Sequence, residues 1–251
     1  MPYTFAVAGK GGTGKTTVAS LVIADLISRE RIPILAVDAD PNANLNENLG
    51  VEVPVTLGDI LAETRDRKNM PAGMSKRRHI EYQVQTALIE KNGFDLMVMG
   101  RTEGPGCYCS VNDILRSYMD ELMPNYDFAV LDNEAGMEHI SRRTTRDIDD
   151  LLLVSDENPI GIRAAGRILQ LVNDLEIFVG RTHLILNRAR REELHPKLQE
   201  EIDKLDLELA GRIPEDDNVL DYNLNQKSML ELPVDTPARK AVAEIMGKVL
   251  Q

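Results

Sequence analysis

Short apolar runs alternate with longer amphipathic segments along the whole chain. The apolar runs predict buried strands at residues 5–8, 34–37, 94–99, 128–131, 151–154, 183–186 and 208–213. Segments with apolar residues at helical spacing predict helices at residues 16–29, 111–122, 160–175, 192–205 and 238–250. Asn158 should cap the third of these helices, with Pro159 in its first turn. This alternation is typical of an α/β fold with a mostly parallel central sheet and helices on both faces.

Between the second and third predicted strands, residues 51–92 are the hardest part of the chain to interpret. Residues 38–50 form a polar loop in this interpretation, and residues 57–64 a short helix. Residues 70–78 are expected to be loop, and residues 79–91 fit either a helix or a strand. No repeat, low-complexity tract or linker divides the chain, so we expect a single domain over residues 1–251.

Composition narrows the possible function classes. Of the 251 residues, 43% are hydrophobic but only 4% aromatic, and Trp is absent, so the core must be aliphatic. A net charge of −12 argues against a general nucleic-acid binder. Two cysteines are too few for a disulfide scaffold and the N-terminus lacks a signal peptide, so we expect a reducing, cytoplasmic location.

Membrane association is not expected either. The sequence contains no run of about 18 apolar residues that could span a bilayer. Near the C-terminus, Val242, Ile245, Met246 and Val249 share one helical face. Glu244 and the lack of a bulky aromatic residue favour a packed helix over a membrane-binding one.

A glycine-rich segment between the first predicted strand and helix has the spacing of a phosphate-binding loop. Its sequence is Gly9-Lys10-Gly11-Gly12-Thr13-Gly14-Lys15-Thr16-Thr17. Glycines let backbone N–H groups turn toward phosphate oxygens, and the helix that follows adds the positive end of its dipole. Lys15 is expected to reach the β- and γ-phosphates of ATP, or the β-phosphate of ADP, and the Thr16 hydroxyl to hold Mg²⁺.

Three aspartates follow predicted strands near this loop. Asp132 is the candidate Mg²⁺ holder of the second Walker motif, through water, and Asp38 can share that task, because a hard cation prefers carboxylate oxygens. Asp40 lies two residues beyond its strand and is the candidate that orients the attacking water. Taken singly, each aspartate also fits a solvated carboxylate that caps a turn; the phosphate-binding loop favours the functional interpretation.

The pattern Lys-Gly-Gly-x-Gly-Lys-Thr, with its second lysine Lys10, resembles the deviant phosphate-loop ATPases. That group contains the nitrogenase iron protein and the division and partition ATPases. The resemblance implies a homodimer in which Lys10 acts on the partner's phosphates and Asp40 belongs to a first switch. It also implies a second switch at Ala135 and Gly136.

Two further strand ends are candidates for contact with the adenine base. An amide such as Asn187 can donate and accept at once, as an adenine edge requires, and the family has an Asn at this place. The segment containing Pro214 resembles the family loop that wraps the base. A helix cap and an ordinary turn are the structural alternatives for these two positions.

The two cysteines, Cys107 and Cys109, are separated by one residue on a Gly-Pro-Gly loop. An incidental buried pair, a redox dithiol and a metal site all fit a lone Cys-x-Cys. Together with the deviant loop, the pair resembles the CooC-type accessory ATPases, which help to load nickel into carbon monoxide dehydrogenase. The resemblance implies Ni²⁺, or Zn²⁺ in its place, on Cys107 and Cys109 between two subunits, with carbon monoxide dehydrogenase as the target enzyme.

Two rival functions remain open on the same fold. One is a positioning ATPase of the division or partition type, against which the cysteine pair and the charge of −12 weigh. The other is an iron–sulfur carrier, although the iron-protein relatives use separated cysteines and this chain has no second separated cysteine.

Overall fold

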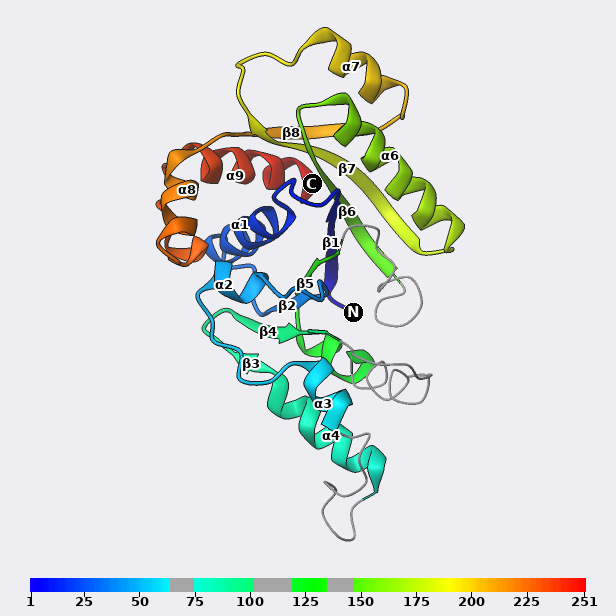
Figure 1. Ribbon diagram of the computed structural model, residues 1–251, viewed down its shortest axis with the longest axis vertical. Helices are drawn as coiled ribbons and strands as arrows, with labels where there is room; N and C mark the ends of the chain where they lie inside the picture. Colours follow the sequence, from blue (N-terminus) through cyan, green and yellow to red (C-terminus); the bar gives the residue numbers. More distant parts are fainter. Residues whose placement is uncertain (64–74, 102–118, 135–146) are drawn as a thin grey trace.

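The computed structural model describes residues 1–63, 75–101, 119–134 and 147–251 (Figure 1). Within them, one eight-stranded sheet has the order β3-β4-β2-β5-β1-β6-β7-β8. Adjacent strands are parallel except for the antiparallel pair β3 and β4. The strands are β1 (Tyr3–Gly9), β2 (Ile34–Asp38), β3 (Ile89–Glu90), β4 (Phe94–Val98), β5 (Phe128–Asp132), β6 (Asp147–Asp156), β7 (Phe178–Ala189) and β8 (Glu208–Pro214).

Helices cover both faces of this sheet (Figure 1). One face packs against α1 (Lys15–Ser28), α2 (Leu45–Leu49), η3 (Met229–Glu231) and α9 (Pro237–Val249). The other face packs against α3 (Leu57–Glu63), α4 (Lys76–Ala87), α6 (Pro159–Asp174) and α7 (Pro196–Asp203). The described ranges also contain η2 (Met123–Asn125) and α8 (Asp217–Leu224).

The central strands have a core on each side because successive side chains of a strand point to opposite faces. In β1, Phe5 and Val7 face the α1 side, whereas Ala6 and Ala8 face the α6 side. Strand β1 lies between β5 and β6, so its carboxyl end is flanked on both sides. The predicted α/β domain, with a mostly parallel sheet covered on both faces, is therefore confirmed.

The terminal helix packs as expected. Val242, Ile245, Met246 and Val249 of α9 are all buried, against the layer that also contains α1 and β8. The part of the chain that the structure describes contains no helix with the length and apolar character needed to cross a bilayer.

The predicted polar loop at residues 38–50 is partly wrong, because it contains the short helix α2. The Asp38 carboxylate accepts a hydrogen bond from the backbone N–H of Leu45, 2.9 Å away, and so fixes the start of the helix. Leu45 and Leu49 are buried on one side of α2, and Gly50 ends it in the left-handed conformation (φ 68°).

The boundary at residue 78 is also wrong. Ser75 accepts a hydrogen bond from the N–H of Arg78 and starts α4 there, so the last residues of the expected loop are helical. The uncertain segment 79–91 is helix to Ala87 and then forms the short strand β3. Of the helix predicted at 111–122, only residues 119–122 are described, and they are helical.

The other differences concern element ends. Helix α7 begins four residues after the predicted start, because Pro196 occupies its first turn and the His195 ring accepts a hydrogen bond from Lys197 N–H. Strands β6 and β7 extend beyond their predicted apolar runs. Helix α8 was not among the predicted elements. It is short, and its apolar residues Val219 and Tyr222 are only partly buried, so its apolar pattern is weak.

Candidate functional site

The carboxyl ends of the central strands bring together most of the predicted site residues. The register pairs Asp38 of β2 with Asp132 of β5, and Asp132 with Val7 of β1. The glycine-rich loop leaves the end of β1 at this same edge. Sheets of this kind bind ligands beyond the carboxyl ends of their strands, and the polar residues gather there.

The glycine-rich loop fits closely between β1, β6 and β7. A Cβ on Gly9 would lie 2.2 Å from the carbonyl oxygen of Val154, so only glycine allows this approach of β1 to β6. Thr13 is buried, and its hydroxyl donates to the Lys10 carbonyl at 2.9 Å. Gly11 and Gly12 are exposed, and a Cβ on either would meet no atom within 4 Å. The loop is therefore anchored at its ends and open in the middle.

Helix α1 starts without a side-chain cap. Its N-cap is Gly14 in the left-handed conformation (φ 86°), and its first turn contains no acidic residue. By contrast, α4, α6, α7 and α8 each begin at a residue whose side chain accepts a backbone hydrogen bond. The uncapped N–H groups and the helix dipole make the start of α1 suited to an anion. Lys15 there is buried, and Thr16 and Thr17 are half-buried.

Asp132 is a buried carboxylate, and neither of its oxygens has a hydrogen-bond partner among the described residues. Burial raises its pKa to about 7, and the charges of Asp38 and Asp40 add to the rise. The Thr16 hydroxyl and Lys15 lower the pKa in part, although the hydroxyl does not complete an aligned hydrogen bond.

Asp38 and Asp40 organise the loop after β2. The fully buried Asp38 carboxylate accepts from Asp40 N–H at 3.1 Å and from Leu45 N–H, and burial raises its pKa to about 6. Asp40 is half-buried and accepts from the backbone N–H of Asn42 at 2.8 Å and from its side-chain amide at 3.0 Å. Asp38 thus lies inside the fold, whereas Asp40 lies at its surface.

These observations match what Mg²⁺ requires. Asp132 is an orphaned buried carboxylate, and the neighbouring Thr16 and Asp38 also present oxygen atoms, the ligand type that a hard cation prefers. The residues present therefore fit the ion. The described ranges contain no group of three or more His, Cys, Asp or Glu side chains that could hold a metal ion on its own, so Mg²⁺ here would also need the Thr16 hydroxyl, phosphate or water oxygens.

A cavity of about 280 Å³ lies beside the loop, between the ends of β7 and β8. Thr17, Asn187 and Pro214 line it together with part of α8, so the two residues predicted for the base share one cavity with the end of the loop. Asn187 is buried and donates its amide N–H to the Thr13 carbonyl at 2.8 Å. Its amide therefore also braces the loop, a contact that sequence reasoning did not predict.

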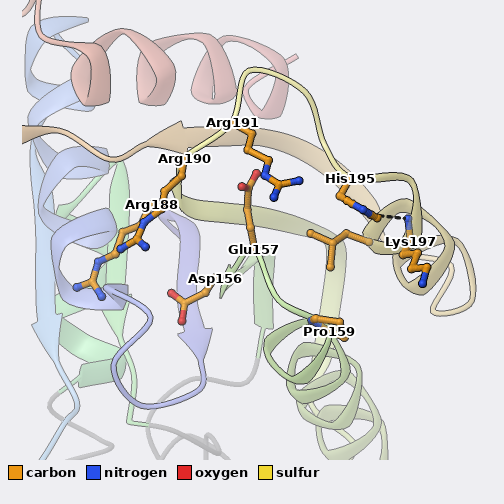
Figure 2. Close-up of a pocket in the computed structure, with 9 residues that line it drawn as sticks. Asp156, Glu157, Pro159, Arg188, Arg190, Arg191, His195 and Lys197 are labelled. Carbon is orange, nitrogen blue, oxygen red and sulfur yellow. Dashed lines mark hydrogen bonds between the residues drawn. The ribbon is translucent and has the colours of Figure 1, made fainter.

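A larger hollow of about 560 Å³ opens on the other side of Arg188 (Figure 2). Asp156 and Glu157 at the end of β6 form one wall, and Arg191, His195 and Lys197 lie along the other. Glu157 pairs with Arg212 and Arg190 pairs with Glu215, so much of the charge is already neutralised within the chain.

The structure also identifies residues that were not predicted. Asn133 is buried, and its side-chain amide donates to the Val7 carbonyl at 3.1 Å, tying the end of β5 to β1. Arg188 donates to the Gly12 carbonyl at 3.0 Å. An amide directly after Asp132 and an arginine directly after Asn187 were visible signals in the sequence.

Lys10 lies on the same glycine-rich loop and is exposed. Cys107 and Cys109, and the second switch at Ala135 and Gly136, lie outside the described residues. Their predicted roles remain predictions.

Known nucleotide-binding proteins are similar to this chain in sequence. Residues 4–229 match the CobQ/CobB/MinD/ParA nucleotide binding domain. An uncharacterized ATP-binding protein of Methanocaldococcus jannaschii is 41% identical over 252 residues, which cover 98% of this chain and 97% of that protein. The carbon monoxide dehydrogenase accessory protein CooC of Rhodospirillum rubrum is 30% identical over 184 residues, which cover 68% of this chain and 70% of that protein.

Solved structures share the fold. The septum site-determining protein MinD of Pyrococcus horikoshii, complexed with Mg-ADP, matches with a TM-score of 0.72 over 99% of this chain and 96% of that one. The two sequences are 22% identical, so this likeness concerns the fold alone.

Proposed function

This chain belongs to the CobQ/CobB/MinD/ParA family of nucleotide-binding P-loop ATPases, and on that basis we propose that it is a Mg²⁺-dependent ATPase that carries nickel. In this proposal it acts in the cytoplasm as a homodimer that forms on binding ATP or metal. Its role is to assist insertion of nickel into a carbon monoxide dehydrogenase.

The buried carboxylate of Asp132 is the observation that carries the ATPase proposal. A carboxylate with no hydrogen-bond partner among the described residues, beside Lys15, Thr16 and the uncapped start of α1, is what a Mg²⁺–phosphate ligand would complete. Backbone N–H groups of the loop would bind phosphate oxygens, and these belong to residues Gly11, Gly12, Thr13, Gly14, Lys15, Thr16 and Thr17. Asn187 and Pro214 would contact the base in the cavity that they line.

The remaining roles follow from position. Thr16, Asp132 and Asp38 would hold Mg²⁺, which when bound neutralises negative charge on the phosphates. Asp40, at the surface and tied to Asn42, would orient the attacking water. Exposed Lys10 would act on the phosphates of the partner chain, which makes the homodimer part of the catalytic unit.

Nickel binding rests on the sequence of the cysteine pair and on the similarity to CooC. Thiolates suit nickel or zinc, and two pairs in a dimer would supply four sulfur ligands. ATP binding would close the dimer and hydrolysis would release the metal.

Metal content and mass in solution, with and without ATP, test the nickel part of this proposal. We expect about half a metal ion per chain in the parent and strong loss in Cys107→Ser, because a shared site needs all four thiolates. One metal ion on an isolated chain, or unchanged metal content in Cys107→Ser, would contradict it.

The dimer role of Lys10 has its own test. Lys10→Ala should still bind ATP but lose hydrolysis, because the missing cation belongs to the partner's site. Lys91→Ala is the matched control, since Lys91 is exposed just before β4, at the amino edge of the sheet. Unimpaired turnover in Lys10→Ala would refute the role.

The second candidate function is a positioning ATPase, and the likeness in fold to MinD favours it. Co-sedimentation with DNA or liposomes in the presence of ATP would support that function, whereas we expect neither. An iron–sulfur carrier is the third, and a brown chromophore after anaerobic reconstitution would favour it.

A further inference from the structure

The end of β7 departs from regular strand geometry at Arg188. The pairing of β7 with β8 shifts register between Leu186 and Ala189, and Arg188 has a positive φ of 55°. Positive φ is uncommon for a residue other than glycine, and such conformations concentrate at functional sites. In a regular strand, two consecutive side chains point to opposite faces of the sheet.

Because of this irregularity, two consecutive side chains reach the same loop. Asn187 Nδ2 donates to the Thr13 carbonyl at 2.8 Å, and Arg188 Nη1 donates to the Gly12 carbonyl at 3.0 Å. A Cβ on Gly14 would lie 2.3 Å from Asn187 Nδ2, so the glycine makes room for this contact. Figure 2 shows Arg188 on the side of the hollow nearest the loop.

The two contacts orient the peptide planes of the loop. In a planar trans peptide, the carbonyl and the N–H point in opposite directions. Holding the carbonyls of Gly12 and Thr13 toward β7 therefore turns the N–H groups of Thr13 and Gly14 away from β7. The Gly12–Thr13 peptide has one further bond in the loop, from the Thr13 N–H to the Lys10 carbonyl at 3.4 Å, which is long for a hydrogen bond. Gly12 itself is exposed and has open space around its Cα.

We propose that Arg188 is a positioning residue that fixes the Gly12–Thr13 peptide of the loop before phosphate binds. Arg188 itself touches the loop rather than the nucleotide, and its effect is on phosphate affinity. This inference rests on the proposed ATPase function, because the loop must bind phosphate for its orientation to matter.

The test compares Arg188→Ala with Arg191→Ala. Arg191 is the control, because it is an exposed arginine that lines the larger hollow but not the cavity proposed for the base. We expect Arg188→Ala to raise KM for ATP and Kd for ADP by about tenfold, the effect of one hydrogen bond from a charged donor. The value of kcat and the affinity for adenosine should change less than about threefold, and Arg188→Lys should recover part of the loss.

A second variant separates positioning from folding. Glycine adopts positive φ without steric cost, so Arg188→Gly should fold and melt near the parent temperature while still binding ADP about tenfold more weakly. Equal ADP affinity in Arg188→Gly, Arg191→Ala and the parent would overturn the inference, as would an equal loss for adenosine and ADP. If the parent itself neither binds nor hydrolyses ATP, the proposed function fails instead.

Discussion

Two buried aspartates on the strands that flank β1 have similar burial but opposite ionisation behaviour. Asp132 of β5 is level with Val7 and is 1% exposed, whereas Asp150 of β6 is level with Phe5 and is 0% exposed. Burial raises the pKa of Asp132 to about 7. The pKa of Asp150 is lowered, because hydrogen bonds from its neighbours outweigh the effect of burial.

The difference lies in the partners that the chain supplies. Asp150 accepts from Tyr3 Oη at 2.5 Å and from Arg181 Nε at 2.9 Å, and it contacts His183 Nε2 at 3.0 Å. Arg181 also donates to the carbonyl of Val249, which ties this cluster to the end of α9. Asp132 has no such partner among the described residues. A satisfied buried carboxylate joins elements together, whereas an unsatisfied one is suited to a ligand that arrives later.

The largest expected effect is on stability at Asp150. Asp150→Asn should lower the free energy of unfolding by about 3 kcal/mol, because removing one partner of a buried ionic cluster leaves charged groups uncompensated. Urea denaturation would measure the loss, with exposed Asp203→Asn as the control. A loss no larger than that of the control would show that the cluster contributes little, and the comparison would fail.

The same substitution at Asp132 should have the opposite sign. Without nucleotide at pH 8, Asp132→Asn should raise the melting temperature by about 3 °C, the shift expected from roughly 1 kcal/mol in a chain of this size. The neutral amide avoids burying a charge that lacks a partner. Scanning calorimetry with and without MgADP would measure it, and the variant should also lose most of the stabilisation that MgADP gives the parent. A lower melting temperature in the variant would mean that the fold already stabilises this charge.

The candidate nucleotide site was easier to predict than the cluster around Asp150, because the sequence signals for the site are local. The loop spacing and the aspartates at the ends of β2 and β5 are continuous motifs, and they met at one edge of the sheet as predicted. Asn187 and Pro214, 27 positions apart by number, also met in one cavity as expected for strand ends in a parallel sheet.

The Asp150 cluster could not be predicted from the sequence in this way. Tyr3 and Asp150 are 147 positions apart. Asp150 directly precedes the apolar run from which β6 was predicted, so the prediction placed it outside the strand. Its pairing with Arg181 extends the strand beyond that run. The positive φ of Arg188 could not be predicted either, because no residue type in this segment indicates a shift in register between β7 and β8.

The dependence of stability on pH also separates the two regions. Asp132, with a pKa of about 7 against an ordinary value of 3.8, binds its proton more tightly in the folded state, and Asp38 does so with a pKa of about 6. The folded state therefore carries more protons between about pH 4 and 7, and its stability should fall as pH rises through that window. Asp150, whose pKa is lowered, contributes stability that is lost as pH falls below about 4.

Urea denaturation of the parent and of Asp132→Asn from pH 3 to 8, without nucleotide, would measure stability as a function of pH. In that curve, the upper limb is the fall in stability between about pH 4 and 7, and the lower limb is the fall below about pH 4. The variant should lose the part of the upper limb above about pH 6, because Asp132 is gone, and should keep a smaller fall below that pH, because Asp38 is still present. The lower limb should be unchanged, because Asp150 is intact. Exposed Asp203→Asn should alter neither limb. An upper limb that is the same in Asp132→Asn as in the parent would assign the pH dependence to groups other than Asp132.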